Sequence, residues 1–163
     1  MNYPNLPPDE PAPALSEIDR RIIRELCIDG RISNAKLAEK VGLSATPCWN
    51  RVQALERAGV IKGYTAVVSQ RAIGLPETVL IEIQLEHHDD ETLDRLSKAL
   101  ADLPDVVEAH FVSGRFDILL KVLVSGTEGY YQFLRTKLFK LPGVSHTQSV
   151  FAIRCIKSGS PVV

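Results

Sequence analysis

Residues 33–59 of the chain, SNAKLAEKVGLSATPCWNRVQALERAG, contain the pattern that decides how its first part folds. They predict two short helices joined by a tight turn, with Ser33 capping the first helix and Ser44 capping the second. Gly42 supplies the turn between them. Pro47 falls in the first turn of the second helix, where no intrahelical N–H is needed, so it marks the start of that helix. This spacing is typical of a helix-turn-helix, whose second helix enters the major groove of DNA.

The side chains of these two helices fall into an inward and an outward set. The inward side of the first helix is expected to be Ala35, Leu37, Ala38 and Val41, and that of the second helix Cys48, Val52 and Leu55. The outward and flanking residues can hydrogen-bond base edges or phosphates. The DNA-binding candidates are Ser33, Asn34, Ser44, Thr46, Pro47, Trp49, Asn50, Arg51 and Gln53.

Two roles are expected within the outward set. We hypothesise that Arg51 and Asn50 contact bases, while Thr46 and Ser44 hold phosphates. The alternative is an ordinary helical hairpin inside a larger core, with Arg51 and Arg57 on a solvated face. The rest of the chain favours the DNA-reading interpretation.

The composition describes a folded protein whose charge is unevenly distributed. With 163 residues and 45% hydrophobic content, the chain is long enough for one large or two small domains. Its net charge is only -1, but residues 15–64 carry nine Lys or Arg against six Asp or Glu, whereas residues 65–163 carry ten against twelve. Phosphate neutralisation supplies much of the affinity for DNA. So modest a basic surplus predicts that one copy binds weakly and that several copies act together.

The sequence also indicates a cellular compartment. No apolar run approaches the roughly 20 residues that span a bilayer, so no contact with a membrane is expected. The N-terminus has neither a basic start nor an apolar core, which predicts no signal peptide and a cytoplasmic protein. Cys27, Cys48 and Cys155 are widely separated and have apolar neighbours. We expect them to be small buried residues in a reducing compartment, rather than disulfides or zinc ligands.

The flanks of the opening stretch complete an N-terminal headpiece. Residues 1–14 contain five of the ten prolines and no periodic pattern, so they are expected to be a flexible tail. A helix begins after Ser16, with Asp19 in its first turn, and its apolar stripe ends at Asp29-Gly30. Residues 15–64 are therefore predicted to form a three-helix, winged-helix-like domain that binds DNA.

A hinge and a second domain follow the headpiece. After Gly59 the run VIKGYTAVVS predicts a hinge strand, and residues 65–76 are expected to be the linker. Residues 77–157 then alternate between the two element types. The expected elements are a strand at 79–85, a helix at 90–103, strands at 106–113 and 116–125, a helix at 127–140 and a strand at 144–156. This βαββαβ order predicts an α+β protein whose second domain is a ferredoxin-like sandwich, with a tail at 158–163.

Few residues have the spacing of a catalytic or metal site. The run His87 to Asp90 contains metal-ligand types, but adjacent residues in a turn point apart and the aspartates are expected to cap a helix. His110 and His146 fall in predicted strands. No nucleophile motif, phosphate loop or catalytic carboxylate pair is visible. We therefore expect no catalytic residue, no metal and no cofactor.

One turn of the second domain is a candidate binding site. In the stretch 113–117, SGRFD, Gly114 can adopt the positive φ of a tight hairpin and expose N–H groups beside a carboxylate that could hold an ammonium. Paired with Thr147, Gln148 and Ser149 on the last strand, it could receive both charged ends of a free amino acid. The alternative is a plain β-hairpin in which Asp117 caps its own turn.

Taken together, these residues resemble a known family. The run from Leu15 to Val68, with its D-R-R-I-I start, G-R-I-S-N turn, V-G-L-S-x-T-P-C helix start and G-V-I-K-G-Y end, is similar to the N-terminal half of the Lrp/AsnC, or feast-or-famine, transcription factors. GRFDILLKV followed by LPGVSHTQSVFAIRCIK resembles their amino-acid-sensing domain. The resemblance covers nearly everything from Leu15 to Lys157.

The resemblance implies a transcription regulator that responds to an amino acid or a related small metabolite. It implies homodimers that assemble further, commonly into octamers, with the effector bound between subunits near the G-x-x-D turn. The effector-binding candidates are then Ser113, Gly114, Arg115, Phe116, Asp117, Thr147, Gln148 and Ser149. At Arg115 the sequence departs from a family member that has an acidic residue there, which leaves the effector open.

A dimer also makes a prediction about its DNA. Its two recognition helices should reach successive major grooves about 34 to 36 Å apart, so the double-stranded operator should be roughly palindromic. Two alternatives remain open. Some relatives with this layout are similar to sirohaem decarboxylases, which bind a tetrapyrrole, and a small-molecule-binding scaffold that never contacts DNA would also fit the layout.

Overall fold

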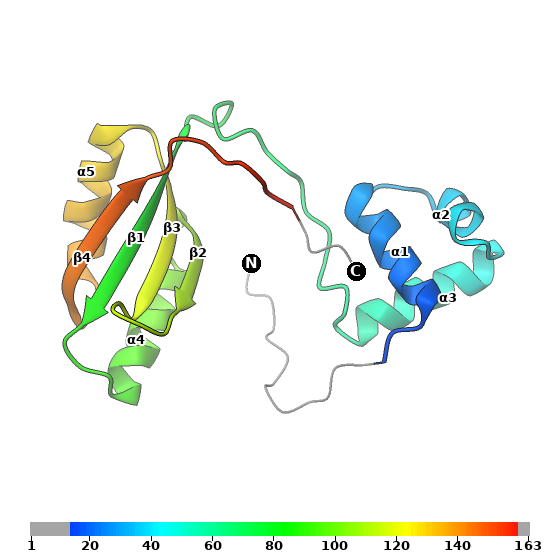
Figure 1. Ribbon diagram of the computed structural model, residues 1–163, viewed down its shortest axis with the longest axis horizontal. Coiled ribbons are helices and arrows are strands. Elements are labelled where there is room, and N and C mark those ends of the chain that lie inside the picture. The colour runs from blue at the N-terminus through cyan, green and yellow to red at the C-terminus, as the bar shows by residue number, and fades with distance from the viewer. Residues whose placement is uncertain (1–13, 160–163) are drawn as a thin grey trace. The chain divides into compact units, whose positions relative to one another are not determined.

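The computed structural model describes residues 14–159 (Figure 1). They divide into an N-terminal unit, residues 14–66 together with 157–159, and a second unit, Val67–Ile156. The tails expected at 1–14 and 158–163 lie almost wholly outside the described residues. Each unit has its own hydrophobic core, so each is described by itself.

The N-terminal unit consists of three helices, α1 (Glu17–Ile28), α2 (Asn34–Val41) and α3 (Ala45–Arg57). Their shared core is built from the residues that helical spacing predicts. The buried members are Ile22, Leu37, Ala38, Val41, Cys48 and Leu55. One expectation is wrong: Ala35 is exposed, because this first-turn residue of α2 lies off the helix side that Leu37, Ala38 and Val41 turn to the core.

The turn between α2 and α3 is the one that the sequence predicts. Gly42 ends α2 in the left-handed conformation, at φ 75°, which costs a glycine nothing. The Leu43 N–H then donates to the Ala38 carbonyl at 2.9 Å, which closes the helix end. Pro47 lies in the first turn of α3, as expected. These features confirm the helix-turn-helix geometry.

The prediction of a hinge strand after Gly59 is wrong. Residues 62–69 run through the described part of the chain without pairing to another segment. A β-strand requires a neighbour to receive its N–H and C=O groups. The β-branched residues of this run favour an extended backbone, but they do not supply that neighbour.

The second unit is a four-stranded antiparallel sheet with two helices (Figure 1). Its elements are β1 (Glu77–Leu85), α4 (Asp90–Ala101), β2 (Val106–Phe111), β3 (Ile118–Val124), α5 (Thr127–Thr136), a 3₁₀ turn η1 (Leu138–Lys140) and β4 (Val144–Phe151). The spatial order of the strands is β2-β3-β1-β4. The predicted βαββαβ ferredoxin-like sandwich is confirmed.

Several element boundaries in this unit differ from the predictions by one or two residues, and those of the last strand and the last helix differ by more. The last strand ends at Phe151 instead of 156, because its partner β1 has few residues left beyond Val79, where the two strands last pair. The last helix leaves the α conformation at Lys137, at φ -125°, and continues as the 3₁₀ turn. Both differences are at element ends, where local sequence carries the least information.

The sheet has one covered face and one open face. Alternate residues of β1 and β3, among them Ile81, Ile83 and Leu120, are fully buried against Leu96 of α4 and Phe133 of α5. The side chains between them point to the opposite face, which no described helix covers. That open face includes the exposed Leu80 and Val150, which are cross-strand neighbours.

Candidate DNA interface and effector site

The outward surface of α3 is the candidate DNA interface. Cys48 and Leu55 of this helix are buried, and the opposite side presents Thr46, Trp49 and Asn50 to solvent. Trp49 is 54% exposed. Thr46 and Asn50 use none of their side-chain donors or acceptors on other described residues. They are therefore available to base edges or phosphates.

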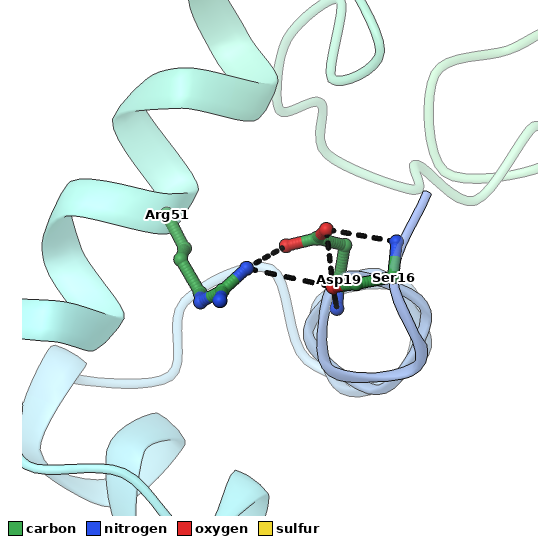
Figure 2. A network of polar contacts seen from close by, with 3 residues as sticks. All are labelled: Ser16, Asp19 and Arg51. Atoms are coloured by element: carbon green, nitrogen blue, oxygen red, sulfur yellow. Dashed lines mark hydrogen bonds and ion pairs between the residues drawn. The ribbon is translucent and has the colours of Figure 1, made fainter. Parts of the chain in front are cut away.

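Arg51 does not belong to this outward surface. Its Nη1 donates to Asp19 Oδ1 at 2.9 Å and lies 3.4 Å from Ser16 Oγ (Figure 2). Asp19 and Ser16 stand at the start of α1, where Asp19 Oδ2 also accepts the Ser16 N–H at 3.0 Å. Arg51 therefore joins the middle of α3 to the first turn of α1. The arrangement does not support its hypothesised contact with a base.

The charge of Asp19 is stabilised by these neighbours. Partial burial by itself raises the pKa of this carboxyl group. The hydrogen bonds from Ser16 and the Arg51 guanidinium outweigh that effect together and hold the pKa below its ordinary value of 3.8. Asp19 is therefore ionised wherever the protein is folded near neutral pH, and the contact with Arg51 is a true ion pair.

Three further DNA-binding candidates are engaged in structural hydrogen bonds. Ser33 caps α2, and its Oγ accepts the Lys36 N–H at the long distance of 3.4 Å. Asn34 Nδ2 donates to the Ala45 carbonyl at 2.8 Å and so ties α2 to α3. Gln53 Nε2 donates to Glu56 Oε2 at 2.7 Å. Ser44 occupies the N-cap position of α3, but the expected side-chain cap is absent.

Sequence reasoning overlooked a hydrogen bond between Tyr64, just before the linker, and α3. The Tyr64 hydroxyl donates to Glu56 Oε1 at 2.9 Å, and Glu56 holds Gln53 with its other oxygen. Burial and the neighbouring Glu56 carboxylate raise the pKa of Tyr64 to about 12. The only sequence signal was the eight-residue separation of an acid and a phenol, which is too common to be noticed. Tyr64 thus contacts α3 in this structure.

The candidate effector turn is a tight connection between β2 and β3. Gly114 has φ 128°, as the sequence predicts, and Ser113 and Arg115 are exposed. The Arg115 guanidinium lies over the Phe116 ring, 5.3 Å from its centroid. The Val112 N–H donates to the Asp117 carbonyl at 2.9 Å, which closes the turn.

Asp117 is already fully engaged within the chain. Its Oδ2 accepts the Leu85 N–H at 2.8 Å, and its Oδ1 is 2.9 Å from His88 Nε2. The Leu85 N–H and then the His88 ring lower the pKa of Asp117 below its ordinary value of 3.8. The carboxylate thus continues the pairing of β1 with β3 by one bond, since Asp117 N already donates to Ile83 O. An incoming ammonium would have to compete with His88.

The other effector candidates lie on β4, two strands away from Asp117. Thr147 and Ser149 pair with Ile83 and Ile81, so their side chains point to the helix-covered face. Gln148 pairs with Glu82 and points to the open face. Within one chain the predicted residues therefore do not converge. Their grouping into one site remains a prediction that requires a second chain.

Two of the three cysteines differ from the expectation. Cys48 is buried, and burial raises the pKa of its thiol, but Cys27 and Cys155 are exposed. Helical spacing did not assign Cys27 a side, and Cys155 follows the end of β4. Within residues 14–159 no three His, Cys, Asp or Glu side chains are grouped as metal ligands. None of the helices in that range is long and apolar enough to cross a membrane.

The Arg51 contact predicts a modest effect on stability and none on base discrimination. We expect Arg51→Ala to lower the free energy of unfolding by about 0.5–1 kcal/mol, because a partly exposed ion pair is lost. The loss should vanish in acid: Asp19 has a depressed pKa, so its stabilisation is complete above about pH 3.8 and disappears as pH falls through the folded value. Urea unfolding at pH 7 and pH 3 measures both effects.

Arg20→Ala, an exposed change on the same α1 helix, is the control and should leave stability unchanged. Arg51→Ala should also weaken binding to a selected DNA duplex and to random DNA by the same factor. A loss confined to the selected duplex would restore the base-reading hypothesis for Arg51.

The Asp117 contacts predict a larger effect. Asp117→Ala should lower the free energy of unfolding by about 1–2 kcal/mol, because the Leu85 N–H loses its acceptor. The depressed pKa again means that this contribution is complete above about pH 3.8 and is lost as pH falls through the lower folded value. Thermal unfolding across this pH range tests the effect, with the exposed Asp94→Ala as control. Equal stability of the two variants would contradict the role in strand pairing.

Comparisons with known proteins agree with both halves of this architecture. A model of winged helix-turn-helix DNA-binding domains matches residues 15–62, and a model of the Lrp/AsnC ligand-binding domain matches residues 78–162. The leucine-responsive regulatory protein of Escherichia coli K12 is 39% identical over 153 residues, which cover 94% of this chain and 93% of that protein. The protein of the same name from Klebsiella pneumoniae has the same identity and coverage.

Solved structures give the same result. An AsnC family transcriptional regulator from Agrobacterium tumefaciens superimposes with a TM-score of 0.86 at 35% identity, covering 91% of this chain and 97% of that one. A transcriptional regulator from Neisseria meningitidis in complex with L-methionine has a TM-score of 0.85 at 26% identity, covering 90% and 95%. Since the matches extend over both units, the chain belongs to the Lrp/AsnC family of DNA-binding transcriptional regulators.

Proposed function

We propose that this regulator reads DNA with the exposed side of α3 and that an amino acid or related metabolite alters its assembly and DNA binding. The observation that carries the first half is the set of unengaged polar groups on Thr46 and Asn50, on a helix whose other side is buried. Asn50 is suited to bidentate contact with adenine. Thr46, in the first turn of α3, is placed to donate to a phosphate.

The effector half of the proposal rests on the family and on the turn at 113–117. The Neisseria relative was solved with L-methionine, and the E. coli relative is named for its response to leucine. An amino acid therefore is the effector class that we propose. Its site would combine the turn of one copy with residues of another, since β4 does not reach that turn within one chain.

A homodimer is proposed from the open face of the sheet. Leu80 is 38% exposed and its cross-strand neighbour Val150 is 53% exposed, on a face that no described helix covers. On the same face, Lys121 and Glu108 form an ion pair at 2.7 Å that could lie at the edge of an interface. A second copy of the same face would bury the aliphatic side chains. The two recognition helices would then read a roughly palindromic operator, and octamers would add further contacts.

The regulation follows from a shift between states. An effector changes DNA binding only by as much as its affinity differs between two assembly or hinge states. The residues named above bind and position; none is assigned a catalytic role. A protein that acts on chromosomal DNA in this way works in the cytoplasm.

Binding to a duplex selected by the protein from a random-sequence pool tests the proposed function. We expect the selected duplex to be bound at least 100-fold tighter than random DNA at about 0.15 M salt, which is below the usual range for specific regulators. One or a few of the twenty amino acids should change that affinity by about 5- to 150-fold, the usual size of an allosteric coupling. Fluorescence anisotropy at a stated salt concentration measures both.

The possible results separate the alternatives. Specific binding that no amino acid alters would remove the effector half of the proposal and keep the DNA half. Binding that is equally weak for all sequences would favour the scaffold reading, or the tetrapyrrole reading if sirohaem changed its absorption spectrum on addition of the protein.

The dimer interface has its own test. Replacing Val150 by Glu places a charge on the open face and like charges near one another between copies, so we expect the variant to sediment as a monomer where the wild type is a dimer or larger. The matched control is Lys98→Glu. Lys98 is an exposed residue of α4, which lies on the other side of the sheet. An unchanged sedimentation coefficient in a folded variant would place the interface elsewhere.

A further inference from the structure

The exposed side of α3 offers no free cation over its first turns. Thr46, Trp49 and Asn50 are uncharged, and Arg51 is held in the ion pair with Asp19. The next cation, Arg57, lies in the last turn, where its Nε donates to the Gln53 carbonyl at 3.2 Å. Because a helix-turn-helix inserts the first part of this helix, the usual arginine contact with guanine is not available there.

Trp49 is the largest side chain on that surface and is left uncovered. It is 54% exposed, and it is the one tryptophan of the chain. The positions four residues before and after it are Ala45, too small to cover the indole, and Gln53, whose amide is turned to Glu56 at 2.7 Å. Among residues 14–159 Trp49 has no aromatic or cation–π partner. A free aromatic surface therefore stands beside Asn50.

We infer that Trp49 is a specificity-determining residue that packs against the C5-methyl group of thymine in the major groove. The methyl group of thymine is the apolar feature of that groove, whereas the other base edges present hydrogen-bond donors and acceptors. An indole ring offers one donor, its Nε1–H, and is otherwise a large apolar surface, which gains by burying a methyl group. This inference rests on the proposed function, because it requires α3 to enter the groove.

The contact differs from a phosphate or sugar contact in what it detects. A tryptophan on the sugar-phosphate backbone would strengthen binding to all sequences alike. A tryptophan on thymine methyls distinguishes thymine from uracil, which differ by that one group. Replacing thymine by uracil therefore isolates the proposed contact without changing the base-pairing edges.

The experiment compares the selected duplex with the same duplex in which uracil replaces thymine, position by position. We expect the wild-type protein to lose about fourfold in affinity for each contacted methyl, the factor that corresponds to ~0.8 kcal/mol per buried carbon. Trp49→Ala should bind the thymine duplex more weakly and show the same affinity for both duplexes. Its thymine-to-uracil ratio also corrects for any effect of uracil on the shape of the DNA.

Intrinsic fluorescence gives a second readout, because Trp49 is the single tryptophan. Its emission should shift to the blue and become protected from iodide when the thymine duplex is added, and less so with the uracil duplex. Phe139→Ala, which removes an exposed aromatic ring from the second unit, is the matched control and should keep the wild-type ratio. Circular dichroism checks the fold of Trp49→Ala, and Trp49→Gln replaces it if that variant does not fold.

Each possible result supports or contradicts the contact between Trp49 and the thymine methyl group. Equal affinity of the wild type for both duplexes, or a uracil penalty as large in the Trp49 variant as in the wild type, would overturn the inference and leave the DNA-binding function intact. Specific binding with unchanged Trp49 emission would do the same. Failure to select any duplex would overturn the proposed function, and the inference with it.

Discussion

The carboxylate of Asp19 stands between two groups that both require a negative charge. One is the free N-terminal end of α1, where it accepts the Ser16 N–H, and the other is the Arg51 guanidinium of α3. A single ionised group thus caps one helix and holds a cationic side chain of another. Burial of Cys48 and Leu55 sets which side of α3 faces the core. The ion pair then keeps the Arg51 guanidinium beside α1, so the side chains exposed on the first turns of α3 are uncharged.

The second unit depends on a different constraint. A four-stranded sheet with both helices on one face buries its alternate residues there and must leave the other residues uncovered. The fold of this unit therefore leaves one face of the sheet uncovered. In the homodimer proposed above, this open face would bring in a second subunit and with it a second recognition helix.

Much of the fold could be predicted from sequence because local signals carried it. Periodicity identified Leu96 and Leu100 as core residues, and Ser16 and Asp19 as the start of a helix, since these depend on neighbours within a few positions. The site was harder to predict. Helical spacing placed Arg51 beside the outward face but could not show an acceptor 32 residues earlier in the chain. In the same way, β-branched residues after Gly59 indicated extension and could not supply a pairing strand, and the SGRFD turn did not reveal that Asp117 takes part in strand pairing.

The bond between Tyr64 and Glu56 shortens the tether that joins the two units. The chain is tied to α3 at Tyr64, and it is tied to the sheet at Gln70, whose Oε1 accepts the Thr78 hydroxyl of β1 at 3.3 Å. Only the five residues 65–69 lie between these points, and they span at most about 18 Å when extended. In the proposed homodimer, a tether so short would keep the second headpiece close to its target once the first is bound. Chain length would then set the effective local concentration of the second headpiece, and the dimer would bind tightly although each headpiece carries little charge.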